Sequence, residues 1–229
     1  MAFNRWLDRR FDALNPRTAQ REIPAGVIQP RHALWFVIIS SVLFVATTWF
    51  INPLCFWLSP IALFVVLFYS YTKRFTALCH LVLGLGLSLA PIGAYLAVTG
   101  HFSLLPVLFS LLVMTWVAGF DIIYALQDEG FDRSQDLHSI PASLGTRKAL
   151  IVSDILHACS GLLVVAAGIY GHFGWLYWTG AAIYIALLVY QHLLVKPNDL
   201  SKVNIAFINT NSMASIVFAV FTILSLVLQ

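Results

Sequence analysis

The sequence has few charged residues, and this shortage excludes most classes of soluble protein. Charged residues make up 10% of the 229 positions, whereas hydrophobic residues make up 60%. A soluble domain usually carries about 25% charged residues. One soluble core cannot bury this much apolar sequence, but a lipid bilayer can accommodate it. We therefore expect an all-α, polytopic membrane protein whose surroundings are the lipid bilayer, with no nucleic acid as a partner.

Cysteine is scarce, and neither cysteine nor histidine is spaced as in a metal site. The three cysteines, Cys55, Cys79 and Cys159, lie in separate apolar segments, so they indicate helix packing and no disulfide framework. The seven histidines form no H-x-x-E-H motif and no pair four residues apart. The N-terminal stretch also lacks the apolar segment and cleavage site of a secretory signal peptide.

Seven apolar segments are long enough to span a membrane, which takes roughly 20 residues for each helix. Short polar connections with Asn-Pro, Thr-Gly-His or Lys-Pro-Asn-Asp separate several of them. The sequence therefore predicts a transmembrane helical bundle of about seven spans, forming a single membrane-embedded domain over residues 1–229. The expected spans are residues 33–50, 53–70, 77–98, 102–127, 149–170, 175–195 and 205–228.

Lysine and arginine are absent from the first, third and fifth loops between these spans. All 13 of these residues lie before the first span or in the second, fourth and sixth loops. The positive-inside rule places the basic side of such a protein in the cytoplasm. Most acids lie on the same side, so we expect an integral protein of a bacterial-type inner (plasma) membrane, with an active site that faces the cytoplasm.

A stripe of acidic residues ends the fourth span, in FDIIYALQDEGFDRSQD (residues 120–136). An isolated Asp in a membrane helix costs roughly 2.5–3.5 kcal/mol, and carboxylates four residues apart repel each other. Mg²⁺ relieves both costs, and it is usually held by one or two carboxylates together with substrate phosphates. On a helix with 100° per residue, the following residues fall at about 0°, −60°, −20° and 20°: Asp121, Tyr124, Asp128 and Asp132.

A second acidic stripe lies near the N-terminus, in NRWLDRRFD (residues 4–12). Asn4, Asp8 and Asp12 recur every four residues, so on a helix they share one face. Two such stripes on one membrane face, with basic loops between them, indicate a site where metal ions neutralise a diphosphate. The other two acids of the longer stretch, Glu129 and Asp136, are expected only to meet water.

These motifs resemble those of the UbiA-type intramembrane prenyltransferases, and the match covers the whole chain in order. NRWLDRRFD and NPRTAQREIPAG resemble the first aspartate-rich motif of that family, usually NDxxDxxxD, and the basic segment after it. DIIYALQDEGFD resembles the second motif, DxxYAxxDxxxD. SYTKRFT is similar to the basic loop between the motifs, and HSIPASLGTRKAL is similar to the segment that follows the second motif.

The resemblance implies a bundle with a central cavity open to the cytoplasmic side, where Mg²⁺ binds a polyprenyl diphosphate between the two motifs. The residues that it implies to be catalytic are Asp121, Tyr124 and Arg74. Those that it implies to bind the metal and the diphosphate are Asn4, Asp8, Asp12, Asp128 and Asp132. The basic residues that it implies to bind the diphosphate are Lys73 and Arg74, with Arg17 and Arg21 as possible substrate-binding residues.

The sequence departs from the family pattern at two points. The family motif has Asp after Asn, where this chain has Arg5, so one potential ligand is lost. Family members usually have nine spans, with the first motif at the end of the second. The resemblance therefore implies that the domain is N-terminally incomplete here and lacks the first one to two helices.

The resemblance also implies a reaction, namely Mg²⁺-dependent transfer of a polyprenyl group to an aromatic acid of the 4-hydroxybenzoate type in ubiquinone or menaquinone biosynthesis. A dihydroxynaphthoate of the futalosine route to menaquinone is an alternative acceptor, because DLHSIPASLG is similar to relatives of both kinds. An inactive shortened protein or a transporter is the alternative of another class. A transporter usually needs polar groups near mid-membrane, whereas these acids gather at one face.

Overall fold

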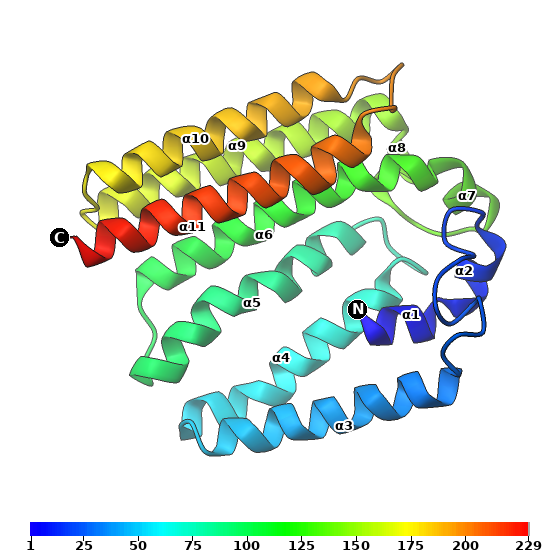
Figure 1. The fold of residues 1–229 in the computed structure, drawn as a ribbon, viewed down its shortest axis with the longest axis horizontal. Helices are drawn as coiled ribbons and strands as arrows, with labels where there is room; N and C mark the ends of the chain where they lie inside the picture. Colours follow the sequence, from blue (N-terminus) through cyan, green and yellow to red (C-terminus); the bar gives the residue numbers. More distant parts are fainter. Residues whose placement is uncertain (229) are drawn as a thin grey trace.

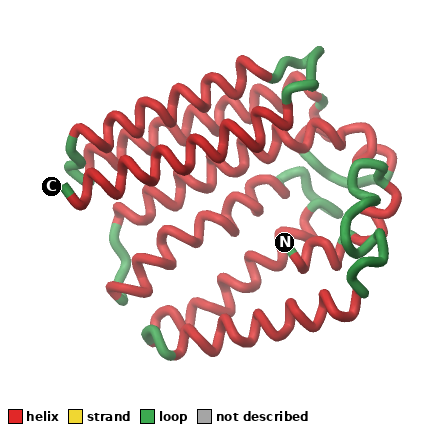
Figure 2. Tube along the Cα trace, viewed as in Figure 1, coloured by secondary structure: helices red, strands yellow, loops and turns green. Residues whose placement is uncertain are grey.

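The computed structural model describes residues 1–228, which form a bundle of long helices with short helices at one end (Figures 1 and 2). The long helices are α3 (Pro30–Trp49), α4 (Pro53–Thr72), α5 (Cys79–Thr99), α6 (Leu104–Ala125), α9 (Thr146–Tyr170), α10 (Trp175–Leu194) and α11 (Asn211–Val227). The short elements are α1 (Ala2–Leu7), α2 (Arg9–Leu14), the 3₁₀ turn η1 (Leu126–Asp128), α7 (Glu129–Ser134), α8 (Ile140–Leu144) and the π-helical turn η2 (Ile205–Thr210).

The seven predicted spans coincide with the seven long helices, and their ends agree within about one helical turn, except that the seventh span, residues 205–228, includes η2 as well as α11. Six helices of the described chain are both long and apolar enough to cross a membrane, and α10 is not among them. That helix has the length of a span but carries three Tyr, two Trp, Gln191 and His192 in its 20 residues. The protein is therefore an integral membrane protein with six helices that meet both criteria and a seventh that meets the length criterion.

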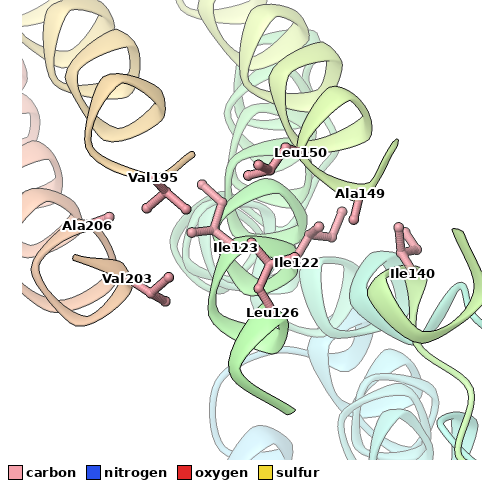
Figure 3. Packing of buried hydrophobic residues seen from close by; sticks show 9 residues of the cluster. All are labelled: Ile122, Ile123, Leu126, Ile140, Ala149, Leu150, Val195, Val203 and Ala206. Atoms are coloured by element: carbon pink, nitrogen blue, oxygen red, sulfur yellow. The ribbon is translucent and has the colours of Figure 1, made fainter. Parts of the chain in front are cut away.

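Helix α6 lies at the centre of the bundle. It packs against α5 on one side and α9 on the other, while α10 and α11 complete its layer, and α3 and α4 continue outward from α5 (Figure 1). Near the end of α6, Ile122, Ile123 and Leu126 form the middle of a buried cluster with residues from α8, α9 and the α10–α11 connection (Figure 3). The second acidic motif therefore begins inside the hydrophobic core.

Two glycines allow α6 to approach its neighbours closely. A Cβ atom on Gly84 of α5 would lie 2.4 Å from the carbonyl oxygen of Met114 on α6. A Cβ atom on Gly119 of α6 would lie 2.4 Å from the ring of His157 on α9. Membrane helices associate through such close packing, because lipid tails remove the hydrophobic driving force between them.

Large apolar side chains cover the outside of the bundle. On α3, Trp35 and Phe36 are exposed, and on α4 the same holds for Trp57 and Phe64. Apolar surface of this extent is unusual on a soluble monomer but is the normal surface of a helix that faces lipid. The loops that carry Lys and Arg lie together at one end of the bundle, at the right in Figure 1.

Candidate active site

The two acidic motifs and the basic loop meet at this charged end of the bundle (Figure 1). The first motif occupies α1 and α2, and α1 contacts both α3 and α4. The second motif runs from the last turns of α6 through η1 into α7. Lys73, which follows α4 directly, lies close enough to interact electrostatically with Asp8, Asp128 and Asp132. One lysine therefore joins the two motifs, which are more than 100 residues apart in the sequence.

The first motif is a helix interrupted at Asp8, which ends α1 and precedes α2. The interruption is slight, since the backbone N–H of Asp8 still bonds Asn4 O at 2.9 Å, and that of Asp12 bonds Asp8 O at 2.8 Å. The side-chain amide of Asn4 also donates to Asp8 Oδ2 at 2.8 Å. The predicted spacing thus holds these three residues together in spite of the break.

Arginines neutralise both carboxylates of the first motif. Arg74 Nη2 lies 3.2 Å from Asp8 Oδ1, and Arg21 Nη1 lies 2.7 Å from Asp12 Oδ1. The second oxygen of Asp12, Oδ2, is buried and has no hydrogen-bond partner within the described chain. A buried carboxylate oxygen without a partner costs free energy, so this oxygen has unused capacity to bind a cation.

Burial also affects the proton affinity of Asp8. It raises the pKa of this carboxyl group above the ordinary value of Asp, and the neighbouring Arg74 offsets only part of the effect. A bound cation reverses such a shift, because it stabilises the ionised form. The surroundings of Asp8 therefore leave its ionised form incompletely stabilised.

Asp128 is the most heavily bonded acid of the second motif. Arg17 forms a two-pronged ion pair with it, through Nη2 to Oδ2 and through Nε to Oδ1 at 2.9 Å. Asn15 also donates to Asp128 Oδ1, at 3.0 Å. Burial alone would lower the pKa of Arg17, but its bonds to Asp128 outweigh that effect and raise it. The segment after the first motif is therefore attached to the second motif.

Asp132 is the most deeply buried acid of the site, with 0% of its surface exposed. Lys73 Nζ lies 2.7 Å from its Oδ1, and the hydroxyl of Ser139 donates to its Oδ2 at 2.9 Å. Ser139 also caps α8, where it accepts the N–H of Ala142. Asp132 is therefore fixed by both the basic loop and the segment after the second motif.

Tyr124 lies between the ion pair of Asp128 and the π-helical turn η2. Arg17 Nη1 donates to its hydroxyl at 2.7 Å, and the guanidinium carbon lies 5.0 Å from the centre of its ring. The ring stacks on Phe207 of η2, with 4.0 Å between the ring centroids. Single π-helical turns inside helices are frequent at functional sites, and this one presents an aromatic ring to the motif tyrosine.

Asp121 has a different kind of partner, which the sequence did not reveal. Its Oδ2 lies 2.7 Å from Nδ1 of His80, the second residue of α5, whose side chain is buried. A search for histidines paired along one helix could not find this contact, because the two residues lie on different helices. The only signal in the sequence was a histidine and an aspartate inside apolar spans, where ionisable residues need partners.

The predicted common face of the second motif is only partly realised. Tyr124 and Asp128 share Arg17, whereas Asp121 contacts His80 and Asp132 contacts Lys73. The 3₁₀ turn η1 interrupts the α-helix within the motif, at residues 126–128. The expectation for Glu129 was wrong: Thr146 donates to its Oε2 at 2.6 Å and Arg133 pairs with its Oε1 at 3.0 Å. Asp136 is exposed in the loop after α7, as expected.

The donor set at this end of the bundle suits Mg²⁺. The described residues contain no group of three His, Cys, Asp or Glu side chains arranged to hold a metal ion. Mg²⁺ usually keeps several waters and takes one or two carboxylates plus substrate phosphates, so paired acids suffice. Each motif offers at least two carboxylates, and the unpartnered oxygen of Asp12 is a hard donor of the kind that Mg²⁺ prefers.

Apolar hollows also lie between the helices. One of about 440 Å³ is bounded by α3, α4 and α5 and is lined by residues such as Phe44, Leu58 and Ala94. Another, of about 340 Å³, lies between α6 and the η2–α11 segment and is lined by Trp116, Phe120 and Phe207 among others. The second hollow shares Phe207 with the stack on Tyr124, so it adjoins the charged site.

Comparison with protein families gives a match to the UbiA prenyltransferase family over residues 1–225. Among curated relatives, the chain is similar to a 4-hydroxybenzoate octaprenyltransferase from Aeromonas salmonicida, with 31% identity over 218 residues. That alignment covers 94% of this chain and 74% of the relative.

Solved structures show the same fold. The apo structure of a UbiA homolog from Aeropyrum pernix K1 aligns with a TM-score of 0.90 and 33% identity, over 99% of this chain and 84% of the other. A UbiA homolog from Archaeoglobus fulgidus, solved with DMAPP and Mg²⁺ bound, aligns with a TM-score of 0.66 and 20% identity. It covers 96% of this chain and 82% of the other, and at that identity it supports the fold alone.

Proposed function

The chain belongs to the UbiA prenyltransferase family, and on that premise we propose that it transfers a polyprenyl group from a polyprenyl diphosphate to an aromatic hydroxy-acid. The observation that carries the proposal is the convergence on Lys73. This residue brings the acids of two distant motifs to one site at the charged end of a lipid-facing bundle. Such a site suits a substrate with a highly charged head and a long apolar tail.

Mg²⁺ is the proposed cofactor, as in the bound state of the Archaeoglobus fulgidus homolog. Asn4, Asp8 and Asp12 would hold one ion, and Asp128 and Asp132 another. When bound, the ions would neutralise the diphosphate and stabilise the charge that develops as it leaves. In the structure the carboxylates pair with Arg and Lys side chains. These basic side chains would bind the diphosphate once the ions occupy the carboxylates.

Lys73 and Arg74 are the proposed cations for the leaving group. The reaction breaks the bond between the allylic C1 of the donor and a diphosphate oxygen, and forms a bond between C1 and an aromatic ring carbon. Charge accumulates on the departing oxygens, so fixed cations beside them lower the barrier. Arg74 can also be held in place by Tyr71, whose ring centre lies 4.8 Å from the guanidinium carbon.

Asp121 is the proposed base that removes the ring proton and restores aromaticity. Asp8, Asp12, Asp128 and Asp132 are each paired with Arg or Lys, whereas Asp121 is paired with a histidine. Within the described chain no Arg or Lys pairs with Asp121, so we assign it the role of accepting the proton. Tyr124 would line the same pocket, with its hydroxyl fixed by Arg17.

The proposed acceptor is 4-hydroxybenzoate, the substrate in the name of the Aeromonas salmonicida relative. A dihydroxynaphthoate of the futalosine route is the alternative, since both are aromatic carboxylates with a phenolic hydroxyl. The product would enter ubiquinone or menaquinone biosynthesis. The proposed location is a bacterial-type inner membrane with the site toward the cytoplasm, which the gathering of Lys and Arg at one end supports.

Purified protein or membranes incubated with a labelled polyprenyl diphosphate, Mg²⁺ and each acid in turn test this proposal. We expect prenylated 4-hydroxybenzoate, complete loss of product with EDTA, and recovery when Mg²⁺ is restored. Product from the dihydroxynaphthoate alone would support the alternative acceptor. Absence of a prenylated product with every quinone-precursor acid would refute the proposed function.

A further inference from the structure

The contact between His80 and Asp121 joins a residue of the second motif to a histidine that no motif singles out. His80 is 3% exposed and stands at the start of α5, next to the end of α6 that carries Asp121. Its Nδ1 lies 2.7 Å from Asp121 Oδ2. A buried histidine facing a carboxylate in a membrane helix needs a reason, since polar groups inside the bilayer are costly.

Both ring nitrogens of His80 are engaged, and together they fix the ring. The backbone N–H of Ile140, the first residue of α8, donates to Nε2 at 3.4 Å. A nitrogen that accepts a hydrogen bond carries no proton, so the ring proton is on Nδ1 and points at Asp121. The histidine therefore holds one oxygen of Asp121 in a defined direction. In metalloproteins, a hydrogen-bonded second residue orients a metal ligand in the same way.

The other oxygen of Asp121 is available to a substrate. Oδ1 has no hydrogen-bond partner within the described chain, and about a quarter of the side chain is exposed, at 24%. Tyr69 of α4 lies within electrostatic reach of both Asp121 and Asp8. Asp121 therefore lies at the same end of the bundle as the first motif, where the donor diphosphate is proposed to bind.

The segment of residues 138–140, which includes Ile140, also contacts the residues proposed to bind the diphosphate. Residues 138–140 donate through His138 N to Lys73 O at 2.7 Å and through the Ser139 hydroxyl to Asp132. Ile140, the next residue, holds His80. The position of Asp121 is thus coupled through three consecutive residues to the positions of Lys73 and Asp132.

We propose that His80 is a positioning residue that holds Asp121 to receive the ring proton during prenyl transfer. The inference rests on the proposed function. In the step concerned, the new bond joins C1 of the prenyl group to the ring, and the C1–oxygen bond to the diphosphate has broken. The ring C–H bond then breaks, its electron pair returns to the ring, and the proton goes to Asp121 Oδ1, while His80 stays hydrogen-bonded to Oδ2.

Replacement of His80 in the active protein tests the inference. His80→Leu removes the donor, and His80→Asn keeps an N–H near the position of Nδ1. We expect His80→Leu to lower kcat by about tenfold to a hundredfold, with KM for the polyprenyl diphosphate within about twofold, as for a misplaced catalytic group. We expect His80→Asn to recover most of that loss. With ring-deuterated acceptor, His80→Leu should also show a larger kinetic isotope effect than the wild type, because proton removal becomes slower.

Two further variants separate positioning from packing. Asp121→Asn is expected to lose more activity than His80→Leu, and the double variant to lose no more than Asp121→Asn, because the histidine acts only through the aspartate. His157→Leu is the control, since His157 is equally buried and also packs on α6, but its ring nitrogens contact His192 and Trp116 O and no residue of the motifs. It is expected to retain kcat.

The results distinguish failure of the proposed function from failure of the role of His80. Wild-type protein without turnover would remove the proposed function and this inference with it. An active wild type whose kcat is unchanged in His80→Leu, or additive losses in the double variant, would overturn the role of His80 and leave the proposed function intact. Equal losses of kcat in His80→Leu and His157→Leu would assign the effect to packing and overturn the role as well.

Discussion

The two acidic motifs differ in how the protein holds them. The second motif begins in the last turns of α6 and continues through η1 into α7. Its Leu126 belongs to the buried cluster of Figure 3, and its Asp132 is fully buried. The first motif lies on two short helices, of which α1 has no buried residue and α2 buries only Asp12. One half of the site is thus positioned by the core, and the other mainly by ion pairs. We infer that the first motif depends more on bound ligands for its final geometry.

The largest expected effect comes from removing one acid of each motif. Asp128→Ala should lower turnover by at least about 10²–10³-fold, because the site loses a proposed metal ligand and Arg17 loses its partner. Asp8→Ala should lower turnover similarly at low Mg²⁺ but recover part of it at high Mg²⁺, because Asn4 and Asp12 remain. Product formation measured against Mg²⁺ concentration separates the two.

Asp136→Asn, which changes an exposed acid of the same region, is the control and is expected to behave like the wild type. Equal recovery of Asp128→Ala and Asp8→Ala at high Mg²⁺ would show that the core contributes no special rigidity to the second motif.

A smaller effect is expected from replacing the arginine that serves each motif. Arg17 binds both oxygens of Asp128 and the hydroxyl of Tyr124, whereas Arg21 makes a single contact with Asp12. Lysine cannot reproduce a two-pronged contact but can replace a single one. Arg17→Lys should therefore lower the thermal midpoint without Mg²⁺ by more than Arg21→Lys does, as measured in detergent. Equal shifts for the two variants would contradict the difference between the motifs.

The smallest expected effect concerns the charge on Asp8. Its pKa is raised in the folded protein, so the ionised form destabilises the fold at pH values above that raised pKa, and the cost disappears as pH falls below the ordinary value of Asp. Asp8→Asn should therefore raise the thermal midpoint at pH 7 without Mg²⁺, and the gain should shrink as the pH is lowered.

Asp199→Asn is the opposite case. Hydrogen bonds from Ser201 lower the pKa of Asp199, so its charge stabilises the folded state, and we expect no gain in the thermal midpoint on neutralisation. If Asp199→Asn raised the thermal midpoint as much as Asp8→Asn, burial of Asp8 could not be the cause of its increase.

The helices and the charged end of the bundle could be predicted from the sequence because each depends on local composition. Runs of about 20 apolar residues define the spans. Loops with Lys and Arg alternate with loops that have neither, and this alternation gives the orientation of each span. The weakest span by composition, α10, was still predicted, because the connections at Gly174 and Lys196 limit it on both sides. The spacing of Asn4, Asp8 and Asp12 likewise survives the break between α1 and α2.

The partners of the acids could not be predicted, because they come from distant parts of the chain. Arg17 and Asp128 are 111 residues apart, and His80 and Asp121 are 41 apart. Periodicity along one helix cannot report such pairs. The 3₁₀ turn η1, which interrupts the α-helix within the second motif, was also not foreseen. Roles of the individual site residues remain predictions until the variants are measured.

Lys73 and Arg74 have a further consequence for how the protein is made. They are the two basic residues of the connection between α4 and α5, and basic residues near the ends of spans decide which loops stay on the side of synthesis. Replacing both residues would affect the orientation of the helices during membrane insertion, before the protein binds any substrate. Under the proposed function, the charges that hold the diphosphate also guide the threading of the newly made chain. Under that proposal, both catalysis and membrane insertion require basic residues at positions 73 and 74.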